Sequence, residues 1–173
     1  MKIQIDDIKE SPKAVSYTEA VEELNSLLAR GAHDFSVPGG LGVDLEHYRA
    51  GLDILLQGKI EGEVVGVCGR CLEDYTFAVE RPFRIVLEPR SAAPRGGGRV
   101  PRDELELDYY DGKEIDTTPH IYEELLLALP TRALCGEDCR GLCVRCGANL
   151  NTGPCGCSVS ASQSAPATTR RGR

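Results

Sequence analysis

The segment from Cys135 to Cys157 contains six cysteines, spaced C-x3-C-x3-C-x2-C-x8-C-x-C, and has few apolar side chains. A segment with so little apolar surface cannot fold by burying a core of its own. Zinc held by thiolates supplies the missing folding free energy in modules of this kind, because metal binding and ordering occur together. The spacing therefore predicts a zinc-knuckle-like module at residues 135–157, with structural zinc as its cofactor.

The pair Cys143 and Cys146 is the firmest ligand prediction in this module. Two intervening residues allow both sulfurs to reach one ion, and Gly147 behind them permits a tight turn of the backbone. The other thiols of the segment are also predicted metal ligands, namely Cys135, Cys139, Cys155 and Cys157. The chain should therefore bind one or two zinc ions.

A second C-x2-C unit, Cys68 to Cys71, lies far upstream and raises the total to eight thiols. Eight thiolates are enough for two tetrahedral sites of four ligands each. The favoured first site consists of Cys143, Cys146, Cys155 and Cys157. The possible second site consists of Cys135, Cys139, Cys68 and Cys71. A single site formed by Cys139, Cys143, Cys146 and one of the last two thiols is the alternative, and an iron–sulfur cluster would use the same four-thiolate ligand set.

The unit Cys68-Gly-Arg-Cys71 also resembles a redox-active pair of the thioredoxin type. That chemistry uses the N-terminus of a helix to lower the pKa of one thiol, whereas strands are expected on both sides of this unit. A thiol–disulfide oxidoreductase using Cys68 and Cys71 is therefore the weaker reading.

The N-terminal residues, from Met1 to Asp7, lack the basic region and the uninterrupted apolar region of a secretory signal. The longest Leu/Ala run, Leu125 to Leu129, is far shorter than the roughly 20 apolar residues that span a bilayer. We therefore expect a cytoplasmic protein with no membrane partner. The reducing cytosol favours metal-bound thiolates over structural disulfides.

The hydrophobic pattern predicts an α+β fold: a bent antiparallel β-sheet or partial barrel with two or three helices. A short strand is expected around Ile3 and Ile5, and further strands from about Asp34 to Pro89, where apolar residues alternate, Leu52 among them. Ser16 and Glu19 have capping-box spacing before an amphipathic helix that ends near Gly31. Thr118 as N-cap and Pro119 at N1 predict a second helix, which ends near Pro130.

Three segments are expected along the chain. Residues 1–134 form the core, residues 135–157 the cysteine module, and residues 158–173 a disordered Ser/Ala/Thr-rich tail. Within the core, residues 89–103 are rich in Gly, Pro and Arg and should form a mobile surface loop. Beyond this loop, Asp111-Gly112 predicts a hairpin between a strand that includes Leu107 and a strand over residues 114–116.

Several functions find no support in the sequence. The chain lacks a phosphate-binding P-loop, a dinucleotide fingerprint and a nucleophile elbow, so we expect no enzyme and no small-molecule substrate. The histidines, His33, His47 and His120, are expected at the surface. A net charge of −7 disfavours general binding to nucleic acid, although Arg140 and Arg145 beside the cysteines are candidate contacts to RNA or to a partner protein.

Three blocks of the chain resemble the YceD-like family. They are Cys68-Gly-Arg-Cys71-Leu-Glu73, Glu123-Glu-Leu-Leu-Leu-Ala-Leu-Pro130 and Cys139-Arg-Gly-Leu-Cys143-Val-Arg-Cys146-Gly-Ala-Asn-Leu-Asn151. Proteins of that family are implicated in the accumulation of large-subunit ribosomal RNA in bacteria and plastids.

The resemblance implies a non-catalytic ribosome biogenesis factor, which we expect to be bacterial. Such a factor would support 23S rRNA accumulation and large-subunit assembly. Its partner would be rRNA, a large-subunit ribosomal protein or an assembly intermediate. A zinc-stapled adaptor for other protein interactions is a further alternative.

Overall fold

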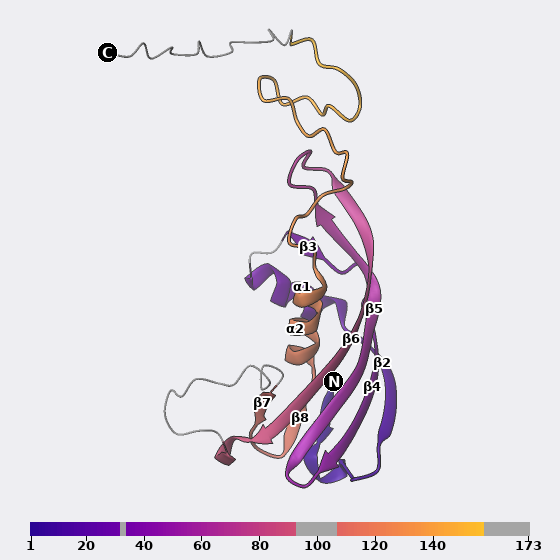
Figure 1. Cartoon of the computed structure of the whole chain (residues 1–173), viewed down its shortest axis with the longest axis vertical. Helices are drawn as coiled ribbons and strands as arrows, with labels where there is room; N and C mark the ends of the chain where they lie inside the picture. Colours follow the sequence, from indigo (N-terminus) through magenta and orange to yellow (C-terminus); the bar gives the residue numbers. More distant parts are fainter. Residues whose placement is uncertain (32–33, 93–106, 158–173) are drawn as a thin grey trace, which may run out of the picture.

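The fold is built on one long, bent sheet, with two helices and a small second sheet on one of its faces (Figure 1). The computed structural model describes residues 1–31, 34–92 and 107–157. The cysteine module lies at one end of the molecule, beyond the turn that joins the two longest strands (Figure 1). The α+β prediction is confirmed, with two α-helices in the described part of the chain and a sheet that does not close into a barrel.

The large sheet has the strand order β2-β4-β5-β6-β7, and β3 also pairs with β5. Its strands are β2 (Lys13–Glu19), β3 (Phe35–Ser36), β4 (Leu41–Ala50), β5 (Asp53–Val67), β6 (Asp74–Pro89) and β7 (Leu107–Tyr110). Buried and exposed residues alternate along β4 and along much of β5 and β6, as the sequence pattern predicted. One face of the sheet is therefore apolar and the other is polar.

Gly58 marks a close approach between β4 and β5. A Cβ atom at this position would lie 1.9 Å from the carbonyl oxygen of Asp44, which is far inside van der Waals contact. Only glycine permits the two backbones to come this close. Gly58 therefore keeps its pairing with Leu45 on one side and with Phe83 on the other in spite of this close approach.

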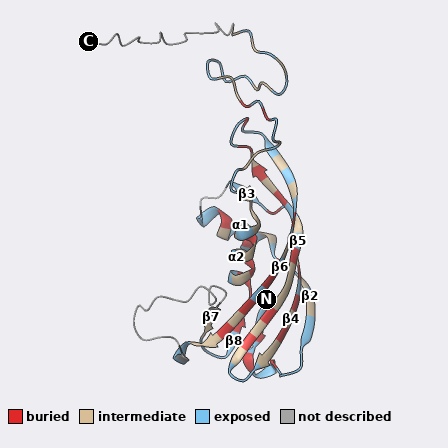
Figure 2. Cartoon of the chain, in the orientation of Figure 1, coloured by how far each residue is buried: buried red, intermediate tan, exposed pale blue. Residues whose placement is uncertain are grey.

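Helices α1 (Val21–Arg30) and α2 (Thr118–Ala128) cover the apolar face of the sheet, which we call the inner face (Figures 1 and 2). Each helix contributes fully buried residues, Leu24 and Leu28 from α1 and Ile121 and Leu125 from α2. They join one core with the inward side chains of the strands, among them Val43, Leu45, Ile54, Leu56, Ile60, Val64 and Leu87. Burial of these aliphatic side chains is the main stabilising contribution to the fold.

The predicted capping box at the start of the first helix is wrong. Ser16 and Glu19 belong to β2, and the N-cap of α1 is Ala20, which makes no side-chain capping bond. The Ser16 hydroxyl donates instead to Asp44 on β4, over 2.7 Å. Pairing of β2 with β4 extends through Glu19 and keeps this segment extended, so tertiary pairing overrides the local signal.

The second helix also begins differently from its prediction. Thr117 is the N-cap, and its hydroxyl donates to the Met1 carbonyl rather than to the helix backbone. Asp116 accepts a hydrogen bond from the Thr118 backbone N–H through Oδ1, over 3.1 Å. The Thr118 hydroxyl, which the sequence predicted as the N-cap group, instead donates to the Glu19 carboxylate over 3.3 Å.

The predicted hairpin around Asp111-Gly112 is wrong as well. The turn exists and Gly112 has a φ of +80°, but the strands on its two sides enter different sheets. β7 pairs in parallel with β6, whereas β8 (Glu114–Asp116) pairs with β1 (Lys2–Gln4) in a separate two-stranded sheet. The large sheet is therefore not purely antiparallel, because the chain returns to the far edge of β6 in the direction of that strand.

The structure differs from the sequence-based predictions at Leu52 and at His47, and it describes only part of the predicted loop. Leu52 lies in the turn between β4 and β5, where it is 70% exposed, and not on an alternating strand. His47 faces the inner side of the sheet and is only 3% exposed, so the surface prediction is wrong for this histidine. The predicted mobile loop is described only at its start, where its first residues form the end of β6 and the 3-10 helix η2 (Arg90–Ala92). Outside the described residues lie the rest of that loop (93–103), His33 and the predicted tail at 158–173.

Across residues 1–31, 34–92 and 107–157, no helix combines the length and the apolar character needed to cross a membrane. The longer of the two helices, α2, has 11 residues. A span of the hydrocarbon core would require about 20 residues.

Candidate metal centres

Cys68 and Cys71 lie in the turn between β5 and β6, where the sequence predicted them. The backbone N–H of Leu72 donates to the Cys68 carbonyl over 2.9 Å, and the N–H of Cys68 donates to the Glu73 carbonyl over 2.9 Å. Leu72 closes this turn with a φ of +60°, which is unusual for a residue with a side chain. The two bonds form a compact loop around the two thiols.

The unit at Cys143 and Cys146 has the same backbone hydrogen bonds. The N–H of Gly147 donates to the Cys143 carbonyl over 2.8 Å, and the N–H of Cys143 donates to the Ala148 carbonyl over 2.8 Å. Gly147 has a φ of +71°, close to that of Leu72 in the other unit. The chain therefore contains one local fold twice. The sequence showed two C-x2-C units but did not predict that their backbones share one conformation, since a leucine occupies the left-handed position in the first unit.

The first group of thiols, which we call the inner cluster, consists of Cys68, Cys71, Cys135 and Cys139, whose sulfurs all lie within 4.8 Å of one another. The Cys68 and Cys139 sulfurs are 3.8 Å apart, and the Cys71 and Cys135 sulfurs are 3.7 Å apart. A tetrahedron of sulfurs around zinc with bonds of about 2.3 Å has edges of about 3.8 Å. The inner cluster thus has the spacing of a four-thiolate zinc site.

The second group, which we call the outer cluster, consists of Cys143, Cys146, Cys155 and Cys157, again with all sulfurs within 4.8 Å. All eight cysteines are free thiols in the structure. Three thiols of the inner cluster are buried, whereas none of the outer cluster is. The two groups have the membership of the two sites favoured from the sequence, and their role as metal ligands stays a prediction.

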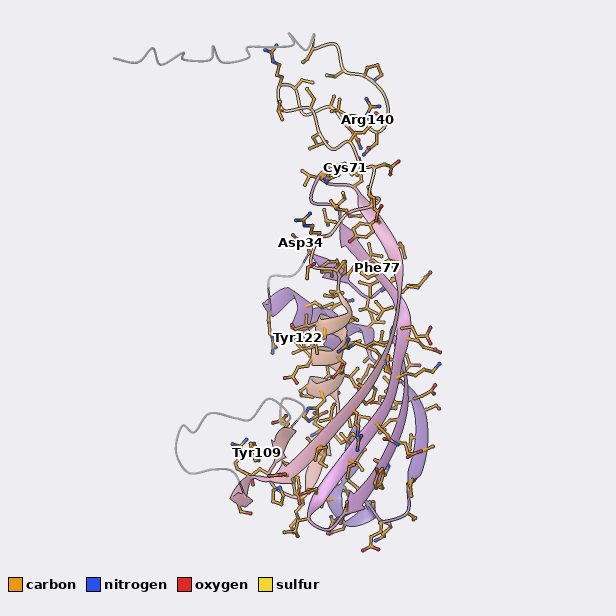
Figure 3. All side chains as sticks on the ribbon, in the orientation of Figure 1. Asp34, Cys71, Phe77, Tyr109, Tyr122 and Arg140 are labelled. Atoms are coloured by element: carbon orange, nitrogen blue, oxygen red, sulfur yellow. The ribbon has the colours of Figure 1, made fainter. Side chains whose placement is uncertain are left out.

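The inner cluster joins the cysteine module to the sheet. Gly69 donates its N–H to the Ala133 carbonyl over 2.8 Å, and Leu142 donates its N–H to the Arg70 carbonyl over 3.0 Å. The Arg70 guanidinium donates to the Cys139 carbonyl over 3.0 Å. Figure 3 shows this junction, with Cys71 at the end of the hairpin and Arg140 just beyond it. Segments far apart in sequence thus supply two thiols each to this cluster.

Two asparagines connect the clusters, and sequence reasoning had not singled them out as site residues. The Asn151 amide donates to the Cys139 sulfur over 3.3 Å, and its Oδ1 accepts the Arg140 N–H over 2.7 Å. The Asn149 Oδ1 accepts the Asn151 N–H over 3.0 Å. Both asparagines belong to the loop between Cys146 and Cys155, so a loop closed by the outer cluster contacts a thiol of the inner cluster.

Nearby hydrogen-bond donors favour the thiolate form of the first cysteine in each C-x2-C unit, Cys68 and Cys143. Hydrogen bonds from backbone N–H groups, chiefly that of Cys71, lower the pKa of Cys68 to about 6. Backbone N–H groups of Arg145 and Cys146 likewise lower the pKa of Cys143 to about 6. The pKa of Cys139 is lowered mainly by the Asn151 amide. Such thiolates are the form that binds a metal ion.

Two thiols of each cluster show the opposite shift, a raised pKa: Cys71 and Cys135 in the inner cluster, and Cys155 and Cys157 in the outer cluster. Cys135, beside Cys139, has a pKa raised to about 12, and Cys157, beside Cys146, also has a pKa raised to about 12. Several sulfurs within 4.8 Å cannot all carry a negative charge without a compensating cation. A divalent ion would supply that charge and deprotonate all four thiols. The donor set and its spacing therefore fit zinc.

Arg140 and Arg145, the predicted partner contacts, are both exposed on the module. The Arg140 backbone N–H donates to the Asn151 Oδ1, a contact that does not use the guanidinium. Neither guanidinium forms an ion pair with any described residue. Both side chains are therefore available for an external contact.

A family model described as "Large ribosomal RNA subunit accumulation protein YceD" matches residues 56–167. That match covers more than half of the chain and includes both cysteine clusters. The chain belongs to the YceD family. The family assignment made from the three sequence blocks is thereby confirmed.

Proteins similar to this chain occur in bacteria and in plants. An uncharacterised protein of Mycobacterium leprae is 28% identical over 114 residues, which are 66% of this chain and 51% of that protein. The chloroplastic YCED homolog 1 of Arabidopsis thaliana is 44% identical over 45 residues, 26% of this chain and 14% of that protein. Its counterpart in Zea mays is 50% identical over 40 residues, 23% of this chain and 14% of that protein. Both plant proteins are named for large ribosomal RNA subunit accumulation.

The chain spans about half the length of the mycobacterial relatives it matches. No solved structure matches it.

Proposed function

We propose that this protein is a non-catalytic ribosome biogenesis factor that supports accumulation of 23S rRNA and assembly of the large ribosomal subunit in the bacterial cytoplasm. The match of the family model over residues 56–167 carries this proposal, because the family is named for accumulation of large-subunit ribosomal RNA. The direct partner would be rRNA, a large-subunit ribosomal protein or an assembly intermediate.

Structural zinc is the second part of the proposal. The inner cluster would hold one ion and the outer cluster another, each through four thiolates. The module at residues 135–157 has little core of its own, so zinc would order it and fasten it to a core formed by residues 1–134. The exposed Arg140 and Arg145 on this module are the proposed contacts to RNA or to a ribosomal protein.

The alternative of a thiol–disulfide oxidoreductase is disfavoured by the position of its two thiols. Cys68 and Cys71 are buried, and each sulfur lies against a thiol of the other segment, Cys139 or Cys135. A redox nucleophile must be reachable by the substrate disulfide. The low pKa of Cys68 suits a metal ligand equally well and does not by itself indicate redox chemistry.

The ribosomal role is tested in a deletion strain of the source bacterium. Large-subunit rRNA should fall relative to small-subunit rRNA, and free large-subunit precursors should accumulate in sucrose gradients. Expression of the wild-type gene should restore both. Normal rRNA ratios and normal subunit profiles in the deletion strain would contradict the proposed function, and a partner set without ribosomal components would instead favour an adaptor for other proteins.

Metal content is tested by elemental analysis of full-length protein purified without a metal-binding tag. Two zinc ions per chain are expected. Cys68→Ser and Cys143→Ser variants should each lose one ion, because their thiols belong to different clusters. Loss of the same single ion in both variants would favour one shared site, and iron with sulfide and visible absorption would indicate an iron–sulfur cluster.

A further inference from the structure

The outer face of the large sheet, opposite the helices, is uncovered by any described element (Figures 1 and 2). Side chains on this face come from alternate positions of β4, β5 and β6, which are intermediate or exposed. Antiparallel sheets commonly place one face in solvent, so exposure alone does not indicate a function. The charges on this face are more informative.

Carboxylates dominate the centre of the outer face. This region contains five acidic residues and only two basic residues, Lys59 and Arg84. We call this surface the acidic face, and its carboxylates are Asp44, Glu46, Glu61, Glu63 and Glu80. Five carboxylates less two basic side chains give this face a charge of −3, opposite in sign to the two candidate contact residues of the cysteine module, in a chain whose net charge is −7.

The carboxylates of the acidic face are only partly neutralised within the protein. Glu61 and Glu80 are direct cross-strand partners, an arrangement of like charges that destabilises a sheet. Lys59 is 2.7 Å from the Glu61 carboxylate and 3.7 Å from that of Asp44. Glu63 and Glu80 form no ion pair with any residue that the structure describes. The isolated protein thus retains repulsion that an external cation would relieve.

A shallow groove of about 530 Å³ lies on strands β2, β4, β5 and β6, next to these carboxylates. The outward side chains at its walls are Ser16, Asp44, Glu46, Gln57 and Arg84, and Gly58 lies among the residues of its floor. Asp44 also accepts from Ser16, and Glu46 also accepts from Gln57. The second oxygen of Glu46 accepts no hydrogen bond from a described residue, and that of Asp44 lies 3.7 Å from the Lys59 ammonium, beyond hydrogen-bond distance.

From these observations we propose that the acidic face and its groove dock an extended, Lys/Arg-rich polypeptide segment of a partner protein. The phosphates of RNA would be repelled by this surface, whereas Lys and Arg side chains can reach several carboxylates from one extended backbone. Complementary charge also accelerates encounter and rejects anionic competitors. The inference does not depend on the proposed function; where that function holds, it assigns this face to a basic protein rather than to RNA.

The test compares two triple variants of the zinc-loaded, full-length protein. Glu61→Gln, Glu63→Gln and Glu80→Gln remove three charges from the acidic face, and Glu22→Gln, Glu23→Gln and Glu123→Gln remove three exposed charges from the helices. The probe is a short fluorescent peptide of alternating Lys, Arg and Ser, titrated by fluorescence anisotropy at physiological ionic strength. The face variant should bind about ten-fold more weakly than the wild type, and the helix variant within about two-fold of it.

Equal losses in the two variants would overturn the proposal, because binding would then follow net charge and not this surface. A single-stranded RNA and an RNA hairpin serve as the second probes. Their affinity should not fall in the face variant, and a fall would assign the face to RNA. The melting temperature of the face variant should equal or exceed that of the wild type, since Glu61 and Glu80 no longer repel each other.

Discussion

The Asn151 side chain donates a hydrogen bond to the Cys139 sulfur over 3.3 Å, from a loop that begins and ends at cysteines of the other cluster. This loop, between Cys146 and Cys155, is closed by the outer cluster, while Cys139 belongs to the inner cluster. An outer ion that orders the loop would therefore also orient an inner ligand. Hydrogen bonds of this kind tune both the basicity and the direction of a metal ligand.

Replacing Asn151 with alanine should weaken zinc binding at the inner cluster by about ten- to hundred-fold, because the Cys139 thiolate loses its side-chain donor. Competition with a chromophoric chelator, resolved into two binding steps, measures this change. Thr152→Ala is the matched control, since the Thr152 hydroxyl donates to the Asn149 carbonyl and contacts no sulfur. Unchanged affinities in Asn151→Ala would show that the hydrogen bond does not support the inner cluster.

Gly147 has a φ of +71° directly after the Cys146 ligand, a conformation that costs other residues about 1 kcal/mol or more. Gly147→Ala should lower the free energy of unfolding of the zinc-loaded protein by about 1 kcal/mol and weaken the outer site. Gly156→Ala should have little effect, because Gly156 lacks a left-handed φ and has open space where a Cβ would be added. Chemical denaturation with chelator titration checks both variants, and similar losses in the two would contradict the argument.

The ion pair between Arg81 on β6 and Glu124 on α2 fastens the second helix to the sheet, with 2.7 Å between the Nε and Oε2 atoms. Glu124 is only 14% exposed and Arg81 is 36% exposed. Arg81→Met should therefore cost about 1 kcal/mol of stability. The solvent-exposed pair of Lys2 and Glu114 offers the control, and Lys2→Met should leave the stability nearly unchanged. Equal effects would mean that burial does not strengthen the Arg81 pair.

His47 should make stability depend on pH near neutrality. Burial, with a smaller effect from Lys13, lowers the pKa of this histidine, and its Nδ1 atom has no hydrogen-bond partner in the structure. The unfolded chain then binds a proton at about pH 6.5 while the folded protein does not. The His47 contribution is thus complete above about pH 6.5 and declines as the pH falls toward the lowered pKa.

His47→Gln should reduce this pH dependence without removing either cluster. Denaturation of wild type and variant at matched zinc concentration, between about pH 7.5 and about pH 5.5, makes the comparison. Acid also protonates the thiols, but this effect is common to both proteins and cancels in the difference. Identical slopes for the two proteins would show that His47 carries no part of the pH dependence.

Several local predictions held because they rest on strong, short-range signals. Alternation of apolar residues along 41–50 and 53–67 is set by burial on one face, and the structure has strands there. The existence of both helices likewise follows from apolar residues at helical spacing, such as Leu24 and Leu28. Their first residues were misplaced, since β2 continues to Glu19 and the side chain of Asp116 takes the role expected of Thr118.

The sequence by itself determined that this chain has too little core in its C-terminal segment and eight thiols at spacings suited to metal. Only the tertiary structure brought Cys68 and Cys71 to within 4.8 Å of Cys135 and Cys139, placed Asn151 on the Cys139 sulfur, and gathered Glu61 and Glu80 on one uncovered face. The spacing of cysteines in the sequence indicates which neighbouring thiols could reach a common ion within one tight turn of the backbone. Contacts between segments more than 60 residues apart depend on how the sheet folds, and no local pattern encodes them.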